Sequence, residues 1–544
     1  MKKRFIGLVI LTLLLSLILA ACSNNTSSVK EKQDSKNNKS GEKTLIFGRA
    51  ADSYSMDPQN ANEIETWRVT KNVYETLVEY DKETTEVVPK LAKDWDVSED
   101  GKTWTFKLQE GVKFHDGTDF NADAVVYNFE RMMDKNHPAR YKATFSVYRG
   151  MFNGFKGEGS VIEEVKAIDP NTVEFKLAEP QANFLANLGM HAFGIVSPEA
   201  LKKYGEKIHE HAVGTGPFKF QSWTPNDSVT LVKNEDYWQK GLPKLDKLIY
   251  KIIPDNSARL TALKNGEIDI MVSLNPSDFN SVKADKNLQV MLRPPLNVGY
   301  LSINNLKEPL NNVKVRQAIN HAIDKKGIAD AFFYGLAEPV KNMLPSASWA
   351  YNNEVEDYDY DLEKAKKLLS EAGYPNGFDL EFSVTSNSRI YMQQPTKMVE
   401  AMKTSLEKIG INVKVVSYEW AAYIDQIRNG EHSIGLIGWV GDNGDPDNFL
   451  YSMLSKNNAV KGSAQNHTFY QNDEVSELLL KAKSVMDQNE RAEIYKKVQK
   501  LAHDDAPSVP LVEVKEPVVT ANYVKGYFPH PTGAENMYEV DIQE

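Results

Sequence analysis

A glycine-rich acidic loop carries the residues of this 544-residue chain that are best suited to chemistry. Residues 438–449 read Gly-Trp-Val-Gly-Asp-Asn-Gly-Asp-Pro-Asp-Asn-Phe, which places Asp442, Asp445 and Asp447 close together. Carboxylates so arranged could neutralise a bound cation, ligate a metal or act as an acid and base pair. The glycines would let the backbone approach a ligand closely. A surface turn rich in Asp and Asn has the same composition, so the residues alone leave both interpretations open.

An enzymatic use of these aspartates has no further motif to support it. The chain contains no Gly-x-Ser-x-Gly and no His-Glu-x-x-His sequence, and its single cysteine, Cys22, precedes the globular part. The loop also differs from a calcium-binding EF-hand, because the sixth position counted from Asp442 is Asp447 instead of Gly and the twelfth is Met453 instead of Glu. We therefore predict that the protein is not an enzyme, with peptide hydrolysis as an alternative.

A second cluster that could bind a metal is His209-Glu210-His211. Imidazole nitrogens suit transition metals such as nickel, but two histidines on either side of one glutamate also suit a polar turn. We predict neither a metal site nor a cofactor, and binding of nickel or of a metal complex is the alternative.

The N-terminus has the anatomy of an export signal. Met1-Lys2-Lys3-Arg4 precedes an uncharged apolar run, Phe5 to Ala21. This run is at the lower limit of the roughly 20 residues that a membrane-spanning helix needs, and it ends in small residues before Cys22. The following residues, 23–43, are mostly Ser, Asn, Lys, Glu, Gln and Gly, with too little apolar surface to fold. We predict a signal peptide over 1–21 and a flexible tether over 22–43.

Composition limits what the rest of the chain can be. Hydrophobic residues make up 41% and aromatic residues 10%, which is enough for a large core in two or more lobes. With one cysteine, no intramolecular disulfide can form. The net charge is -11, and an acidic surface argues against binding nucleic acid.

Apolar periodicity from residue 43 onward alternates between strand and helix. Period-two alternation predicts strands at 103–108 and 173–177, and the intervening segment 121–134 is expected to be a helix capped by Asn121. Further strands are expected at 45–47, 268–272, 379–385 and 412–417, and further helices at 258–265, 315–323, 362–372 and 396–408. Strand 379–385, helix 396–408 and strand 412–417 form a predicted βαβ unit. The fold class is therefore α/β with mixed sheets.

Seven short motifs follow one another between residues 56 and 318. They are Met56-Asp57-Pro58; Leu91-Ala92 with Trp95; Asp100-Gly101-Lys102; Gly111 to Gly117; Gly214 to Phe218; Asn234 with Tyr237-Trp238; and Val315-Arg316-Gln317-Ala318. In this order they resemble the family 5 extracellular solute-binding proteins, the dipeptide, oligopeptide and nickel binders of ABC importers. Leu19-Ala20-Ala21-Cys22 likewise resembles the bacterial lipobox, in which the cysteine becomes the lipidated first residue.

The resemblance implies a two-lobed clamp like a type II periplasmic binding protein, with lobes that hinge shut on a solute. It also implies three domains. Domain I would be discontinuous, over 44–83, 212–293 and 510–544; domain II, over 84–211, would be inserted in it. Domain III, over 294–509, would form the opposing lobe.

The dipeptide binders of this family are the subgroup that the chain resembles most, and the resemblance implies specific ligand contacts. Asp442 would take the peptide ammonium, because a buried cation is costly without a carboxylate. Arg389 would bind the terminal carboxylate with its planar guanidinium, and Asn62-Glu63-Ile64 would pair with the peptide backbone. The remaining expected ligand-binding residues are Tyr391, Gly438, Trp439, Val440 and Trp420, of which Tyr391, Trp439 and Trp420 would wall side-chain pockets.

The function implied is capture of short peptides, such as dipeptides, tripeptides or murein peptides, for an ABC permease and its ATPase subunits. The protein would be a monomer that binds no nucleic acid. Lipid on Cys22 would hold it at the extracytoplasmic face of the cell membrane, an arrangement that suits a Gram-positive bacterium. A sensing or scavenging role has the same sequence features.

Overall fold

Three large sheets organise residues 41–543, the part of the chain that the computed structural model describes. The predicted signal peptide, Cys22 and most of the predicted tether lie outside the described residues. From Glu42 onward the described chain forms one structural unit, and none of its helices is long and apolar enough to span a bilayer.

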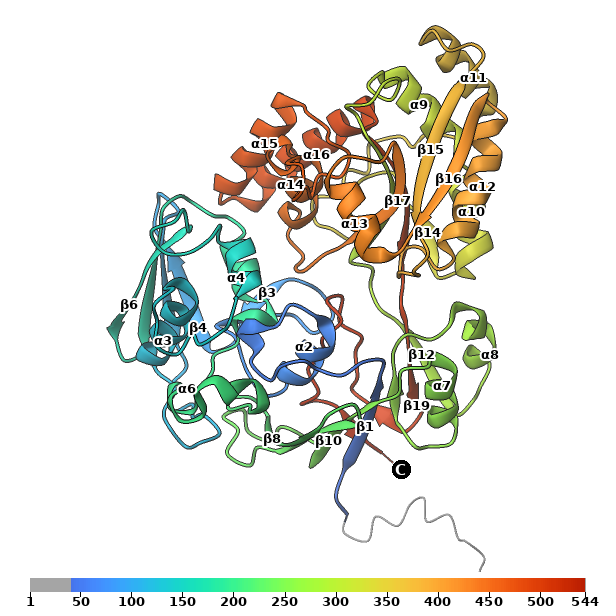
Figure 1. The fold of residues 1–544 in the computed structure, drawn as a ribbon. Helices are drawn as coiled ribbons and strands as arrows, with labels where there is room; N and C mark the ends of the chain where they lie inside the picture. The colour runs from blue at the N-terminus through green and yellow to red at the C-terminus, as the bar shows by residue number, and fades with distance from the viewer. Residues whose placement is uncertain (1–40, 544) are drawn as a thin grey trace, which may run out of the picture. The chain divides into compact units, whose positions relative to one another are not determined.

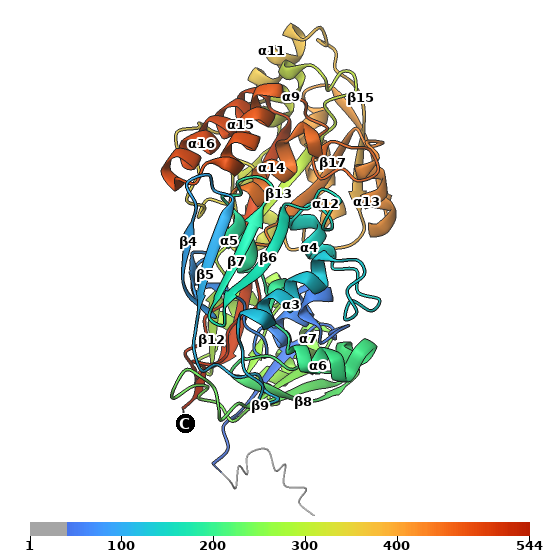
Figure 2. The same cartoon turned by 90° about the vertical axis from the view of Figure 1, so that its left-hand side faces the viewer.

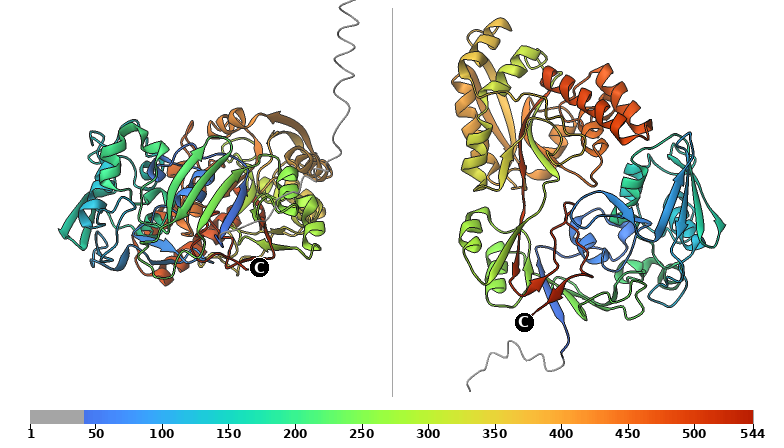
Figure 3. Two further views of the ribbon diagram at one scale, coloured as in Figure 1. Left: turned by 90° about the horizontal axis from the view of Figure 1, so that it is seen from below. Right: turned by 180° about the vertical axis from the view of Figure 1, so that it is seen from behind.

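The first sheet has seven strands drawn from distant parts of the chain. Their order is β12 (Leu288–Leu292), β19 (Pro517–Ala521), β11 (Ile270–Met271), β1 (Thr44–Arg49), β10 (Lys247–Ile252), β9 (Ser228–Lys233) and β8 (Phe218–Thr224). Strand β1 is parallel to β10 and β11, whereas the other pairs are antiparallel. Figure 3 shows from below how the blue strand β1 lies among the green strands. The sheet is therefore mixed.

The second sheet is antiparallel and is formed within residues 92–177. Its order is β4 (Ala92–Val97), β5 (Thr103–Leu108), β7 (Thr172–Leu177) and β6 (Ile162–Asp169), and Figure 2 shows it facing the viewer. Helix α3 (Ala122–Met133) begins where the Asn121 side chain accepts a hydrogen bond from the Ala124 N–H. Phe129 of α3 packs edge-on against Phe175 of β7, so period-two residues of the strands and the apolar face of the helix share one core.

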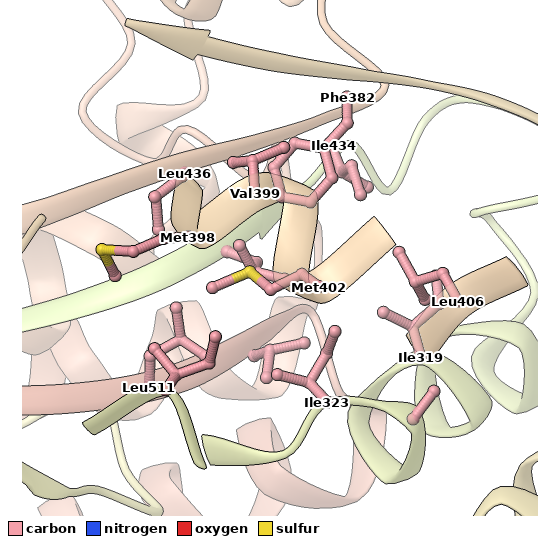
Figure 4. Packing of buried hydrophobic residues seen from close by; sticks show 14 of the residues in the cluster. Ile319, Ile323, Phe382, Met398, Val399, Met402, Leu406, Ile434, Leu436 and Leu511 are labelled. Atoms are coloured by element: carbon pink, nitrogen blue, oxygen red, sulfur yellow. The ribbon is translucent and has the colours of Figure 1, made fainter. Parts of the chain in front are cut away.

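The third sheet contains the predicted βαβ unit. Its order is β14 (Ala337–Pro339), β18 (Ser508–Val514), β13 (Asn297–Ile303), β17 (Ile434–Val440), β15 (Phe378–Thr385) and β16 (Ile411–Tyr418). Strands β15 and β16 are parallel and are joined by α12 (Pro395–Glu407). In Figure 4, Met398 and Met402 of α12 pack with Phe382, Ile434 and Leu511 of the sheet.

Helices cover this third sheet with two separate apolar cores. On the side of α12 lie α9 (Val313–Ala322), α10 (Lys325–Phe333) and α11 (Leu362–Glu371). The other core includes residues of α13 (Trp420–Arg428), α14 (Asp447–Leu454), α15 (Asp473–Ser484) and α16 (Gln488–Asp505).

Shorter elements complete the described chain. The strands are β2 (Val78–Tyr80), β3 (Val87–Pro89), β20 (Val524–Lys525) and β21 (Asp541–Ile542). The helices are α2 (Ile64–Thr70), α4 (Ser146–Met151), α5 (Phe184–Leu188), α6 (Pro198–Tyr204), α7 (Asn256–Lys264) and α8 (Phe279–Lys283). The 3-10 turns are η1 (Pro58–Asn60), η2 (His191–Phe193), η3 (Gly205–Glu210), η4 (Pro276–Asp278) and η5 (Lys456–Asn458).

The chain crosses between the first and third sheets through residues 293–296 and 515–516. We call residues 42–292 and 517–543 the first lobe and residues 297–514 the second lobe (Figure 1). The two crossings are tied together, because the Arg293 N–H donates to the Glu516 carbonyl at 2.9 Å and its guanidinium pairs with the Glu516 carboxylate at 2.9 Å. Two adjacent short connections are typical of a hinge between lobes.

The α/β class and the two-lobed architecture expected from sequence are confirmed, while the three-domain division stays a prediction. The strand expected at 268–272 is shorter than predicted, running only from Ile270 to Met271. Ser273 follows with a left-handed φ of 60°, which turns the backbone out of the sheet.

Candidate functional site

The acidic loop begins where β17 ends, and its first aspartate differs from the other two. Asp442 is exposed, whereas Asp445 and Asp447 are buried. The Asp442 N–H donates to Asn448 Oδ1 at 3.1 Å, and Asn448 Nδ2 donates to Asp442 Oδ2 at 3.3 Å. Although Asp442 is exposed as a residue, protein atoms surround its carboxyl group, and this desolvation raises the pKa of the carboxyl above its ordinary value. Asp442 forms no ion pair with any residue of the described chain, so its charge is available to a ligand.

Asp445 has an internal partner instead. Arg491 of α16 grips its two carboxylate oxygens at 2.9 and 2.7 Å, and both side chains are about 95% buried. The guanidinium pKa rises because Asp445 offsets the cost of burying the cation. This carboxylate is therefore neutralised by the protein and is not free to bind a ligand.

Asp447 also has protein partners, and it lies in contact with the first lobe. Asn183 donates to its Oδ2 at 3.0 Å, and the Lys483 ammonium lies 3.7 Å from the same oxygen. Burial raises the pKa of the Asp447 carboxyl to about 6. Of the loop's three aspartates, Asp442 alone combines exposure with the absence of an ion pair among the described residues.

Arg389 lies in the segment after β15, as the sequence predicted. Its guanidinium stacks on the Trp420 ring, 3.9 Å from the ring centre. Its backbone forms a two-way bridge with Met392, with N···O distances of 3.1 and 3.0 Å. The side chain is half-buried and has no ion pair among residues 41–543. One face of the cation is thus covered by an aromatic ring, while its edge can still donate hydrogen bonds.

Tyr391 contacts the start of the acidic loop and belongs to the core of the second lobe. Its ring lies against Gly438, where an added Cβ would be 2.5 Å from the ring, so this close approach requires glycine. Burial raises the pKa of the Tyr391 phenol to about 12, which keeps it neutral at physiological pH. Because only 6% of Tyr391 is exposed, its ring packs against the backbone at Gly438 and presents little surface to a ligand.

Asn448 is a site residue that sequence reasoning missed. Besides holding Asp442, its Oδ1 accepts a hydrogen bond from the Trp439 indole N–H at 3.4 Å. It therefore fixes Trp439 at the end of β17 and Asp442 in the loop at the same time. Between them, Val440 is half exposed. The only signal in the sequence was an amide six positions after an aspartate, a pattern too common to single out.

The segment Asn62-Glu63-Ile64 lies on the first lobe. The exposed Asn62 donates its backbone N–H to the Tyr54 hydroxyl at 2.9 Å. Glu63 caps α2 by accepting from the Glu65 and Thr66 N–H groups at 2.6 and 2.8 Å, and Ile64 is already helical. Only Asn62 and Glu63 therefore precede the helix, and the backbone of Glu63 is extended.

The structure brings most of the predicted ligand residues together on the second lobe. Direct contacts join Arg389 to Trp420, Tyr391 to Gly438, and Trp439 through Asn448 to Asp442. No such contact links these residues to segment 62–64 within the described chain. The two groups belong to opposite lobes.

The two rings of the histidine cluster contact different neighbours in the described part of the chain. The His209 ring hydrogen-bonds the Glu206 carbonyl at 2.6 Å, whereas the His211 ring stacks on Tyr204 at 3.9 Å. No group of three His, Cys, Asp or Glu residues between 41 and 543 is arranged to hold a metal ion. The polar-turn interpretation agrees with these contacts.

Comparison with known proteins places these contacts in a family. The family described as "Bacterial extracellular solute-binding proteins, family 5 Middle" matches residues 86–461. The chain is 38% identical over 517 residues to the dipeptide-binding protein of Escherichia coli K12, covering 92% of this chain and 95% of that protein. It is 37% identical over 541 residues to heme-binding protein A of Haemophilus influenzae, covering 97% of each.

A solved structure is similar over nearly the whole described chain. The periplasmic binding protein DppA of Helicobacter pylori, in complex with the peptide STSA, superposes with a TM-score of 0.76. The identity is 38%, and the match covers 92% of this chain and 98% of that one.

Proposed function

The chain belongs to the bacterial extracellular solute-binding proteins of family 5, and we propose that it captures short peptides between its lobes for an ABC importer. The observation that carries this proposal is a pair of opposite charges, neither of which is neutralised by an ion pair among residues 41–543. Asp442 and Arg389 lie on the same lobe, and neither forms an ion pair within the described chain. A free peptide has an ammonium at one end and a carboxylate at the other, which is the matching pair.

The chemistry of each contact suits one end of a peptide. An ammonium that loses water on binding needs a carboxylate to offset the cost, and Asp442 is already partly desolvated. A planar guanidinium can donate two parallel hydrogen bonds to a carboxylate, and the stack on Trp420 limits how Arg389 can turn. Backbone pairing to Asn62 and Glu63 on the first lobe would add recognition that does not depend on side chains.

Export and anchoring belong to the same proposal. The lipobox-like sequence before Cys22 supports lipidation of that cysteine, which would keep the protein on the extracytoplasmic face of the cell membrane. The ABC permease and its ATPase subunits are the partners that a solute-binding protein of this kind would serve. A monomeric state and a Gram-positive source stay predictions.

Direct ligand identification tests the proposed function. The full chain is purified in detergent without denaturation, bound molecules are released and identified by mass spectrometry, and calorimetry follows with dipeptides, a tripeptide, nickel and hemin. We expect one intact short peptide per protein. Nickel or hemin binding without peptide binding would contradict the proposal, and so would recovery of cleaved peptide.

Changing Arg389→Lys should weaken dipeptide binding about tenfold or more, because hydrogen bonds to charged groups are worth about 1.5–3 kcal/mol and a lysine cannot supply the paired donors. Calorimetry with a dipeptide and with its C-terminal amide measures this. The loss should shrink for the amide, which has no carboxylate to bind.

A matched control is Arg149→Lys, which changes an exposed arginine stacked on Phe155 in the first lobe. It should bind like the parent protein. Equal affinities of the Arg389→Lys variant and the parent for the free dipeptide would remove Arg389 from the site.

A further inference from the structure

Asn183 and Asp447 make a buried contact between the two lobes. Asn183 precedes α5 in the first lobe and Asp447 is the first residue of α14 in the second, and each residue is only 7% exposed. Asn183 Nδ2 donates to Asp447 Oδ2 at 3.0 Å. Nearby, the Ala182 N–H donates to the Lys483 carbonyl at 2.7 Å. The end of the acidic loop is therefore part of the interface between the lobes.

Both partners of this contact hold an oxygen that lacks a hydrogen bond. Asp447 Oδ1 and Asn183 Oδ1 are buried, and neither has a partner in the described chain. Turning the amide over would place its oxygen against the carboxylate, which is worse. A proton on Asp447 would provide the missing donor, because a carboxylic acid can donate through one oxygen while accepting through the other.

We propose that Asn183 and Asp447 form a proton-dependent latch, in which protonation of Asp447 strengthens the contact between the lobes and so favours closure on the ligand. The lobe contact stands on the structure alone, and the link to ligand capture rests on the proposed function. Asp447, one half of the latch, lies in the same loop as Asp442, so ligand binding and lobe contact share one segment.

The groups that face Asp447 determine the direction of the pH effect. Lys483 of α15 is 3.7 Å from Oδ2 and favours the charged form. Asp445 of the loop disfavours the charged form of Asp447, whereas Arg491 of α16 favours the charged form. Burial disfavours the charged form most strongly. The phenol of Tyr495 in α16 also interacts electrostatically with Asp447. The first lobe contributes the neutral amide of Asn183. Burial dominates and raises the Asp447 pKa to about 6.

The sign of the effect follows from linkage between protonation and closure. When the lobes part, water returns to Asp447 and its pKa falls toward the ordinary 3.8. Closure then takes up a proton. The closed form is therefore stabilised relative to the open form as the pH falls through about 6, and this stabilisation is lost as the pH rises. If the pKa falls from about 6 the whole way to 3.8, the closing constant is about tenfold higher at pH 5 than at pH 7.5, and a smaller fall gives a smaller change.

Small-angle X-ray scattering of the ligand-free full chain in detergent, at pH 7.5 and pH 5, measures closure without any peptide. We expect the parent protein to become more compact at pH 5. Asp447→Asn should abolish the pH response and stay compact at both values, because its amide can donate to Asn183 as the protonated acid would. Asn183→Ala should weaken the response and be less compact at both values, because the protonated acid then has no amide oxygen to accept its hydrogen bond.

Asn187→Ala is the matched control. Asn187 makes the neighbouring lobe contact, accepting from Asn443 Nδ2 at 3.0 Å, and neither side chain titrates. This variant should be less compact at both pH values but keep the pH response of the parent. A pH response that survives unchanged in Asp447→Asn, or that Asn187→Ala weakens as much as Asn183→Ala does, would overturn the latch.

Dipeptide calorimetry at the same two pH values separates the latch from the proposed function. Affinity of the parent should rise with compactness at pH 5, and the affinity of Asp447→Asn should not change. If the parent compacts at pH 5 but binds no peptide, the proposed ligand class is wrong and the latch stands. If it binds peptide equally at both values and does not compact, the latch is wrong and the ligand class stands.

Discussion

Replacing Asp442 by asparagine is expected to lower dipeptide affinity by about 2–5 kcal/mol, which is about 30-fold or more. The variant keeps the size of the side chain and an oxygen that can accept the hydrogen bond from Asn448. It loses the negative charge, so the ligand ammonium would be enclosed without a counterion. Calorimetry of the parent and the variant with the same dipeptide measures the difference.

N-acetylation of the dipeptide should reveal whether Asp442 contacts the amino end. The parent protein should bind the acetylated ligand with much lower affinity than the free dipeptide. The Asp442→Asn variant should bind the two ligands with nearly equal affinity. Asp123→Asn, an exposed aspartate on α3, is the control and should behave like the parent. If acetylation and the Asp442 change weaken binding independently, the ammonium binds elsewhere.

Local patterns were sufficient to predict many elements of the fold. Strand 103–108 and helix 121–134 appear within one or two residues of their expected bounds, because alternation and capping are properties of adjacent residues. The βαβ unit ending at residue 418 was also predicted, since its two strands and helix follow directly in the chain. The order of the seven-stranded sheet was not, because β1 pairs with β10, more than 190 residues later.

The candidate site was predicted unevenly for the same reason. Glycines and carboxylates marked the acidic loop, but its sequence could not say which aspartate is free. That depends on Arg491, 46 positions after Asp445, and on Asn183, 264 positions before Asp447. Family resemblance supplied Arg389, whereas its stack on Trp420 became visible only in the folded chain. The contacts that separate a binding carboxylate from a structural one are long-range.

Changing Arg491→Met is expected to lower the free energy of unfolding by about 3–5 kcal/mol, because it leaves the Asp445 carboxylate buried without its counterion. Chemical denaturation followed by circular dichroism measures this loss. The effect should be large because both side chains are about 95% buried and joined by two hydrogen bonds at 2.9 and 2.7 Å. Lys142→Met, which breaks an exposed pair with Glu206, should change stability by less than about 1 kcal/mol.

A double change separates the cost of an unpaired charge from the worth of the pair itself. Asp445→Asn together with Arg491→Met removes both charges and keeps an oxygen to accept the hydrogen bond of the Asp447 N–H. Most of the lost stability should return, because a buried ion pair gains little over neutral groups that fill the same space. If the double variant is as unstable as Arg491→Met, the arginine stabilises the loop mainly through its packing on Trp349 and Tyr495. Recovered stability with unchanged dipeptide affinity would show that Asp445 holds the loop and takes no part in binding.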